Sequence, residues 1–276
     1  MKARTTRRVL ALALAFAFAF AASVLLSACA GSSTPRRDSP PAHERRLVAI
    51  GDSIPYGAQD CHFCTAFPEL FGRAITSATR IPVRVDNRAE HTGITSTDLR
   101  KEILTGRELR AAVAAADIVL VTIGHNDTPW NREDDPCDGR ANGLRSHWCD
   151  YRGTCLRDAA RDYSRNLDRI LGEIEKLRRG RSTVLRVTDD YNDVLGEPSA
   201  PRRAASASRR VLDVYSRSTC EVARRHHGRC IDTYHAFNGP RGSRDAGPLL
   251  SFDHTHPSAE GHKRIAELLA AAGFGP

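Results

Sequence analysis

The stretch Leu47-Val48-Ala49-Ile50-Gly51-Asp52-Ser53-Ile54-Pro55-Tyr56-Gly57 decides how this chain folds. Its first four residues are apolar and form a short run that is typical of a buried strand. The run ends at a glycine, an acid and a serine, which are turn-forming residues. In open α/β sheets, ligands bind at the edge where parallel strands end. The tripeptide alone is also ordinary turn chemistry, so a role for Ser53 depends on residues elsewhere in the chain.

The rest of the chain alternates between expected strands and expected helices. Further strands are predicted at residues 82–89, 117–123, 182–188 and 229–233, with helices at 67–78, from 98 onward, at 158–179, at 201–227 and in a last segment that runs to 269. This alternation is typical of βαβ units and a parallel sheet. We therefore predict an α/β domain over residues 46–276, with a three-layer α/β/α sandwich around a mostly parallel, five-stranded sheet.

Four short blocks carry the chemistry of the sequence. They read Gly51-Asp52-Ser53-Ile54, a lone Gly93, Gly124-His125-Asn126-Asp127 and Asp253-His254-Thr255-His256. In this order they resemble the blocks of the SGNH hydrolases, also called the GDSL esterases and lipases. The resemblance spans nearly the whole expected domain and implies a flavodoxin-like fold and hydrolysis of carboxylic esters. Ile54 stands where leucine is usual in the family, which is a volume-conserving difference.

The resemblance also implies a role for each of these residues. A serine hydroxyl needs a base to become nucleophilic, so Ser53 would be the nucleophile and His256 the base. Asp253 would orient His256 and stabilise its imidazolium. The oxyanion hole would consist of the N–H groups of Ser53 and Gly93 and the side-chain amide of Asn126. His125 has no expected catalytic role.

Two other histidines lie close to His256 in the sequence. His254 directly follows Asp253 and is poorly placed to be held by that carboxylate. His262 falls inside the last expected helix. Pro257 and Ser258 mark the start of this helix, which fixes the residues just before it. These positions favour His256 as the base.

The N-terminus has the pattern of an export signal. Lys2, Arg4, Arg7 and Arg8 make the first eight positions basic. Residues 9–26 form an almost unbroken apolar run, and small residues precede Cys29 in Leu26-Ser27-Ala28-Cys29. This tetrapeptide resembles a bacterial lipobox, which implies a signal peptide over residues 1–28, cleavage before Cys29 and lipidation of that cysteine. Residues 29–45, rich in Ser, Pro and Arg, would then be a flexible tether. The alternative is a retained transmembrane anchor, because 18 apolar residues almost span a bilayer.

The charge balance argues against nucleic acid as a partner. The formal net charge is +8, and removal of residues 1–28 would lower it to +4, with the basic residues scattered among acidic ones. The sequence shows no glycine-rich phosphate loop and no dinucleotide fingerprint. We therefore expect no cofactor and no metal, a monomeric protein, and a small-molecule, lipid or glycan ester as its substrate.

Seven cysteines follow Cys29, and in an exported protein they are candidates for disulfides. They are Cys61, Cys64, Cys137, Cys149, Cys155, Cys220 and Cys230. Expected pairs are Cys220 with Cys230, Cys61 with Cys64, and two of the other three. Half of a zinc site is an alternative for Cys61 and Cys64, but no second pair has the spacing of metal ligands. An odd number leaves one cysteine unpaired within this set.

Residues 128–157 interrupt the α/β pattern as a polar, cysteine-rich insertion. It follows Asn126 directly, and its Trp130 and Trp148 suggest a lid or a wall that binds an acyl group or a sugar. The sequence thus predicts an exported, lipid-anchored serine esterase. The alternatives are an acyltransferase or thioesterase that uses the same site, and a non-catalytic lipoprotein that only binds its ligand.

Overall fold

Five short parallel strands form the central sheet of the protein. The computed structural model describes residues 44–57, 61, 63–132, 135–137, 148 and 151–275. Its strands are β1 (Arg45–Gly51), β2 (Val83–Asn87), β3 (Ile118–Thr122), β4 (Val184–Thr188) and β5 (Arg229–Ile231). Their order is β2-β1-β3-β4-β5, and every neighbouring pair is parallel. This is the flavodoxin-like order, in which the switch point lies between β1 and β3.

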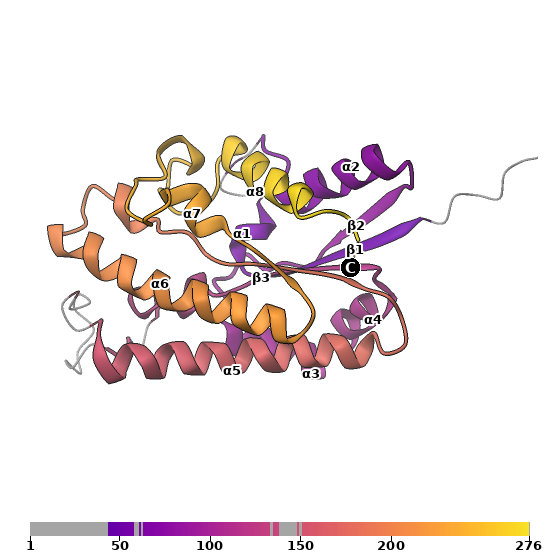
Figure 1. Cartoon of the computed structure of the whole chain (residues 1–276), viewed down its shortest axis with the longest axis horizontal. Coiled ribbons are helices and arrows are strands. Elements are labelled where there is room, and N and C mark those ends of the chain that lie inside the picture. Colours follow the sequence, from indigo (N-terminus) through magenta and orange to yellow (C-terminus); the bar gives the residue numbers. More distant parts are fainter. Residues whose placement is uncertain are drawn as a thin grey trace, which may run out of the picture. The chain divides into compact units, whose positions relative to one another are not determined.

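Eight helices are present in the described part of the chain. They are α1 (Ser53–Tyr56), α2 (Phe67–Thr79), α3 (Ser96–Thr105), α4 (Arg107–Ala115), α5 (Gly153–Leu177), α6 (Arg202–Arg225), α7 (Thr233–Asn238) and α8 (Ala259–Ala271). Figure 1 shows α2, α7 and α8 on one side of the sheet and α3, α4, α5 and α6 on the other. The predicted α/β class and three-layer arrangement are confirmed.

Alternate residues of β1 explain why the sheet is covered on both faces. Val48 and Ile50 belong to the core cluster that contains the buried faces of α3 to α6. Leu47 and Ala49 belong to the second cluster, with side chains of α2 and α8. Because successive side chains in a strand point to opposite faces, an apolar run without alternation requires burial on both sides.

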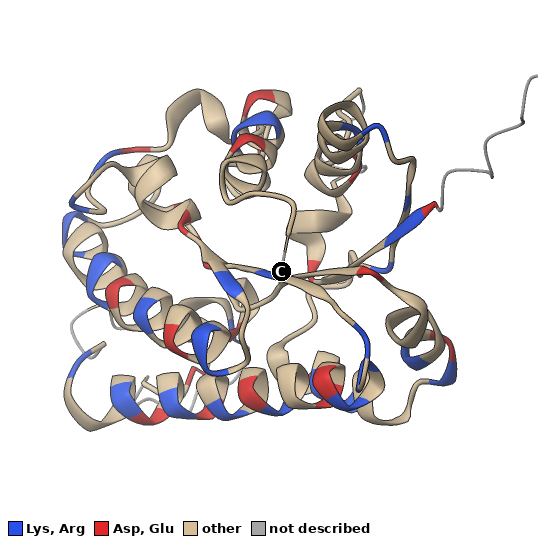
Figure 2. Ribbon diagram, turned by 45° about the vertical axis from the view of Figure 1, so that its right-hand side comes forward, with Lys and Arg blue, Asp and Glu red and all other residues tan. Residues whose placement is uncertain are grey.

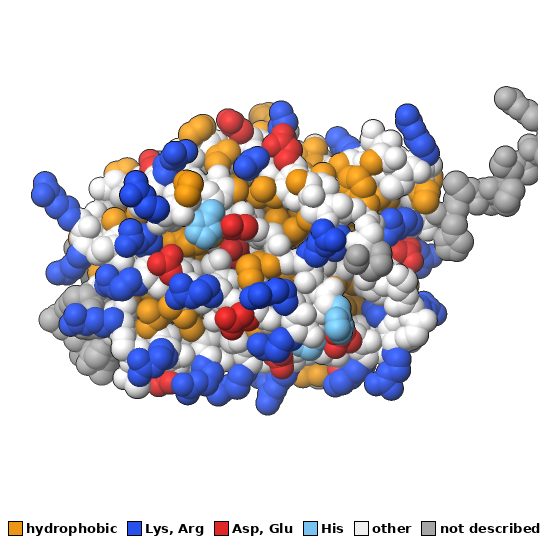
Figure 3. Space-filling model, viewed as in Figure 1, with side chains coloured by type: hydrophobic (Ala, Val, Ile, Leu, Met, Phe, Trp, Pro, Cys, Tyr) orange, Lys and Arg blue, Asp and Glu red, His pale blue; other side chains and the backbone are white. Residues whose placement is uncertain are grey.

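Charged side chains lie on the solvent sides of the covering helices. Figure 2 shows acidic and basic positions recurring along α5 and α6, and most of these positions are exposed. Figure 3 shows basic side chains spread over one face of the molecule with acidic side chains between them. This agrees with the scattered charges in the sequence.

Several element boundaries differ from the sequence-based expectations. The first strand was expected to end at Ser53, but β1 ends at Gly51, because Asp52 caps α1 by accepting a hydrogen bond from the N–H of Ile54. The helix expected from residue 98 onward is divided into α3 and α4 at Gly106, which has an extended backbone. α5 begins five residues earlier than expected, and its first turns include Cys155, which is bonded to Cys137. α7 was not expected.

The expected signal peptide and the tether up to residue 43 lie outside the described residues, as does Cys29. Within the described part of the chain, none of the helices combines the length and the apolar character needed to cross a bilayer.

Three disulfides join six of the seven cysteines. Cys220 is bonded to Cys230, and Cys61 is bonded to Cys64. In the insertion, where the sequence left the choice open, Cys137 pairs with Cys155. Cys149 lies outside the described residues.

Candidate active site

Ser53 lies at the start of α1, directly beyond the end of β1. Gly51 makes this turn possible: its φ is +148°, and a Cβ there would be 1.7 Å from the carbonyl oxygen of Thr122 in β3. Asp52 is fully buried, and its N–H donates to the same carbonyl at 3.2 Å. The Ser53 hydroxyl is thereby held at the edge of the sheet, where the side chain is 7 % exposed. Only glycine fits where two neighbouring strands approach this closely.

The loop before α8 brings a histidine and an aspartate to this serine. The Nε2 atom of His256 is 2.9 Å from Ser53 Oγ, and its Nδ1 atom is 2.6 Å from Asp253 Oδ2. The structure therefore joins Asp253, His256 and Ser53 in one chain of hydrogen bonds across 203 residues of sequence. With Nδ1 donating to Asp253, Nε2 of a neutral ring is free to accept the serine proton.

The carboxyl group of Asp253 is held in its ionised form. Burial acts to raise its pKa, but hydrogen bonds from the His256 ring and from the N–H groups of Thr255 and His256 outweigh burial, and the pKa is lowered. An ionised partner favours the imidazolium that forms when His256 accepts a proton.

The two sides of this loop are bonded to each other. The N–H of Ser251 donates to the carbonyl of His256 at 2.7 Å, and Leu250 and Pro257 form an antiparallel bridge. Ser258 then caps α8 by accepting from the N–H of Gly261. These bonds hold the backbone on either side of His256, so the ring has little freedom to leave Ser53.

The two other histidines near His256 in the sequence occupy different surroundings. His262 is 1 % exposed in α8 and stacks with Phe67 at a ring distance of 5.9 Å. Burial and the nearby His256 lower its pKa to about 4. His254 is exposed, with a positive φ of 58°. Of these three histidines, His256 is the one that is hydrogen-bonded to both Ser53 and Asp253.

Gly93 and Asn126 lie next to each other although 33 positions separate them. Gly93 has a φ of +70°, and a Cβ on it would be 3.9 Å from Asn126 Oδ1. The side-chain amide of Asn126 donates to the carbonyl of Ile94 at 2.9 Å. Asp127 fastens the same loop, because its carboxylate accepts from the N–H and the hydroxyl of Ser96. The Gly93 loop and Asn126 are therefore held as one unit.

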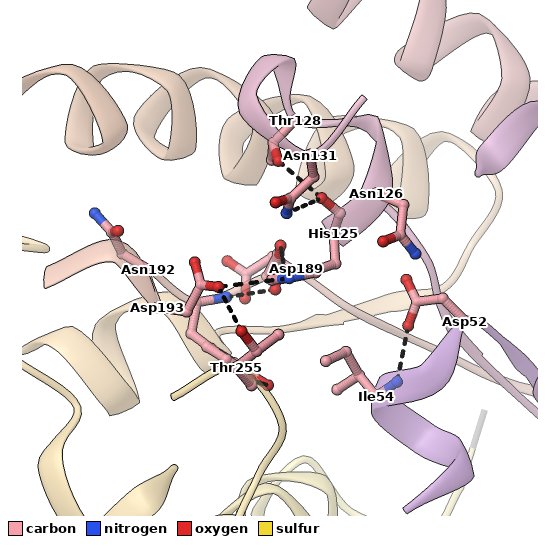
Figure 4. Close-up of polar contacts among 12 residues, drawn as sticks. Asp52, Ile54, His125, Asn126, Thr128, Asn131, Asp189, Asn192, Asp193 and Thr255 are labelled. Carbon is pink, nitrogen blue, oxygen red and sulfur yellow. Dashed lines mark hydrogen bonds and ion pairs between the residues drawn. The ribbon is translucent and has the colours of Figure 1, made fainter. Parts of the chain in front are cut away.

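A buried cluster of charges lies beside this unit and was missed by the sequence analysis. His125 is 5 % exposed, and its Nδ1 and Nε2 atoms lie 3.0 Å from Asp190 and 3.6 Å from Asp193. Figure 4 shows the His125 ring reaching toward the acidic segment after β4. Burial lowers the pKa of His125, but Asp190 and Asp193 together raise it to about 10. His125 is thus a buried cation held between two carboxyl groups.

This cluster is connected to the loop that carries Asp253 and His256. Thr255 Oγ1 donates to Asp193 Oδ2 at 3.3 Å, and the hydroxyl of Tyr191 donates to the Thr255 carbonyl at 2.7 Å. Tyr191 is 2 % exposed and stacks on Phe237 in α7. The signal in the sequence was the polar run 189–193 directly after β4, at the same edge of the sheet as Ser53.

A pocket of about 600 Å³ lies on the Thr255 side of the site. Its lining contains both expected tryptophans, Trp130 and Trp148, whose ring centroids are 5.4 Å apart. Its lining also includes Glu197, Arg203 and the His254–Thr255 segment. Its volume is within the usual range for ligand sites, roughly 300–1,000 Å³.

Two groups of residues have side chains of the kinds that bind metals. Cys61 and Cys64 are bonded to each other, so neither sulfur is free to bind zinc. Among the described residues, Asp189, Cys220 and Cys230 lie close enough together to hold an ion. The sulfurs of the two cysteines form a disulfide, and the Asp189 carboxylate accepts hydrogen bonds from Ser216 and Thr233.

Comparison with known proteins assigns this chain to a family. The sequence model of the GDSL-like lipase/acylhydrolase family matches residues 49–264. No curated protein sequence matches the chain.

Solved structures share the fold at low sequence identity. The lipase Lip_vut3 from a goat rumen metagenome is 20 % identical, with a TM-score of 0.65 over 84 % of this chain and 98 % of its own. An acetylxylan esterase from Geobacillus stearothermophilus is 23 % identical, with a TM-score of 0.56 over 83 % of this chain and 94 % of its own. An extracellular lipase from Streptomyces rimosus is 19 % identical, with a TM-score of 0.59 over 83 % of this chain and 100 % of its own.

Proposed function

Because the chain belongs to the GDSL-like lipase/acylhydrolase family and is a carboxylic ester hydrolase, we propose that it works through an acyl-serine intermediate on Ser53. The observation that supports this most directly is the hydrogen-bonded chain from Asp253 through His256 to the Ser53 hydroxyl. A serine at the end of a buried strand, with an imidazole nitrogen at 2.9 Å, is the arrangement that nucleophilic attack on an ester requires.

The reaction follows from the positions of these groups. His256 Nε2 takes the proton as Ser53 Oγ attacks the ester carbonyl, and Asp253 stabilises the imidazolium. The oxyanion that forms is stabilised by the N–H groups of Ser53 and Gly93 and by the Asn126 amide. His256 then returns the proton to the leaving alcohol. Water repeats the sequence on the acyl-serine and releases the acid.

The alternatives differ in what accepts or carries the acyl group. An acyltransferase would pass the acyl group to another alcohol, and a thioesterase would release a thiol, with the same triad. A non-catalytic binding protein would have lost one of the reacting groups, and all of them are present here. Hydrolysis releases one acid for each ester consumed and transfer releases none, so titration of the product acid distinguishes the two. Activity on a thioester substrate identifies a thioesterase.

The nucleophile is tested with Ser53→Ala. We expect this variant to lose at least about 10³-fold in kcat on p-nitrophenyl acetate, the scale of loss when a triad member is removed. It should also fail to bind a fluorophosphonate probe covalently, whereas Ser206→Ala, an exposed serine in α6, should react like the wild type. Retention of most of the turnover by Ser53→Ala would overturn the assignment.

Export and lipid anchoring at Cys29 are part of the same proposal. The basic, apolar and small-residue order of residues 1–29 supports them, as do three disulfides, which persist in oxidising compartments. The Streptomyces rimosus neighbour is itself an extracellular lipase. Metabolic labelling with a radioactive fatty acid should mark the wild type and leave Cys29→Ser unmarked. Labelling of both would contradict a thioether anchor at this residue.

A further inference from the structure

The pocket beside the active site lies on the side where an ester's alcohol must leave. In the proposed mechanism, on which this inference rests, His256 Nε2 protonates the departing oxygen, so the alcohol part of the substrate lies against the His256 loop. The pocket is lined by His254 and Thr255 of this loop. Asn131 and Asp193, two other members of its lining, both contact His125, which directly precedes Asn126 (Figure 4). The pocket therefore adjoins the loop against which the alcohol part of the substrate would lie.

One wall of the pocket is aromatic. Trp130 and Trp148 contact each other, and both contact Tyr151 at ring distances of 5.9 and 5.4 Å. Trp130 also packs against the core cluster that contains Tyr151. This packing keeps an indole surface in the pocket without requiring a ligand to order it, which lowers the entropy cost of binding.

Other residues of the lining form a polar, charged wall. Glu197 is half-buried, and its Oε1 atom accepts from the N–H and the hydroxyl of Ser199 at 3.0 and 2.7 Å. These bonds lower the pKa of Glu197, so the carboxylate is ionised. Arg203, at the beginning of α6, adds a cation to the same wall. Covering these charges with a hydrocarbon chain would remove them from water without giving them partners, which is unfavourable.

A sugar ring suits both walls. Its faces present C–H groups, which pack on aromatic rings, and its edges present hydroxyls, which pair with a carboxylate and a guanidinium. We infer that this pocket binds the carbohydrate part of an acylated sugar, with Trp130 and Trp148 against the ring and Glu197 and Arg203 on its hydroxyls. The chain is then an esterase that removes acyl groups from carbohydrates, and the pocket selects the alcohol and not the acyl chain.

Glu197→Gln and Arg203→Ala test this inference, since both residues are partly or fully exposed and their replacement leaves the core intact. The substrates are an acetylated xylo-oligosaccharide, which fills the pocket, and p-nitrophenyl acetate, which carries no sugar. We expect kcat/KM on the oligosaccharide to fall roughly tenfold or more in each variant, the effect of losing a hydrogen bond to a charged group. On p-nitrophenyl acetate it should stay within about twofold of the wild type.

Two exposed residues further along α6 provide matched controls. Glu221→Gln and Arg217→Ala make the same chemical changes outside the pocket lining, and both should leave the oligosaccharide reaction unchanged. In Trp130→Ala, kcat/KM should fall on the oligosaccharide and not on p-nitrophenyl acetate, as in Glu197→Gln. The melting temperature of Trp130→Ala shows whether the aromatic cluster remains folded.

The inference is overturned if the pocket variants lose the same factor on both substrates, or if they lower kcat/KM on p-nitrophenyl octanoate and not on p-nitrophenyl acetate, which differ only in the acyl chain. The second result would mean that the pocket takes an acyl chain. In either case the Ser53-dependent hydrolysis of p-nitrophenyl acetate would remain, so failure of this inference is distinguishable from failure of the proposed function. Loss of that hydrolysis in Ser53→Ala tests the proposed function separately.

Discussion

The hydroxyl of Thr255 donates a hydrogen bond to the buried carboxyl group of Asp193, 62 residues away in the sequence. Thr255 lies between Asp253 and His256, and Asp193 is one of the two carboxyl groups around His125. The loop that holds the imidazole against Ser53 is therefore supported by a buried charge cluster on a different strand end. Because the imidazole must stay within hydrogen-bond reach of Ser53, a small displacement of this loop should lower the rate of the chemical step.

Thr255→Val tests this support. The substitution keeps the shape of the side chain and removes the donor, so we expect kcat on p-nitrophenyl acetate to fall about three- to tenfold, the range of one net hydrogen bond. KM should change by less than twofold, because the groups that contact the ester remain. Thr255→Ser retains the hydroxyl and should restore kcat. Equal activity of the valine and serine variants would show that the bond to Asp193 does not position the loop.

The amide of Asn126 is expected to act on the transition state. Asn126→Ala should lower kcat by about 10²–10³-fold with little change in KM, as for other oxyanion-hole donors. Asn166→Ala is the control, because Asn166 bonds to the hydroxyls of Ser96 and Thr97 and supports the same region without facing the ester. A comparable loss in Asn166→Ala would mean that Asn126 acts only by holding the loop.

The buried His125 should make stability depend on pH in the alkaline range. Its pKa is raised from 6.5 to about 10 by Asp190 and Asp193, which outweigh burial. The folded protein therefore keeps a proton that the unfolded chain loses near pH 6.5, so the stabilisation is complete below that pH and is lost as pH rises toward 10. We expect the melting temperature of the wild type to fall between pH 7.5 and 9.5.

His125→Gln removes the titrating group from this cluster. Asp52, Asp190 and Asp193 then lack the cation. The melting temperature of the variant at pH 7.5 should therefore be roughly 5 °C or more below that of the wild type. Its further fall up to pH 9.5 should be smaller than that of the wild type. Parallel curves for the two proteins would show that another group causes the pH dependence. Thermal unfolding followed by circular dichroism measures both quantities.

Alanine substitutions at two glycines with positive φ distinguish the cost of backbone strain from the cost of a steric clash. Gly51 and Gly180 have φ values of +148° and +76°, but a Cβ at Gly51 meets the Thr122 carbonyl at 1.7 Å and one at Gly180 meets nothing within 4 Å. Gly180→Ala should cost about 1–2 kcal/mol of unfolding free energy, the cost of strain alone. Gly51→Ala should prevent folding, or separate β1 from β3. Chemical denaturation distinguishes these outcomes, and similar stability of the two variants would contradict the close approach of the strands.

Much of the architecture followed from local patterns in the sequence. The apolar run Leu47–Ile50 required burial on both faces, and the alternation of strands and helices required a parallel sheet. The ends of helices and strands were harder to predict from the sequence, because they depend on capping residues. Asp52 begins a helix at Ser53, and Gly106 divides one expected helix into two.

The sequence by itself determined the residue types and the order in which the chain presents them: a serine after the first strand, a glycine and an asparagine after the next two, and an aspartate and a histidine before the last helix. Only the tertiary structure decided which groups meet. Nothing local indicates that His125 lies between Asp190 and Asp193, or that Thr255 bonds to Asp193. The physical reason is that parallel strands bring their carboxyl ends to one edge whatever their separation along the chain, and burial there fixes the charge of the groups that meet.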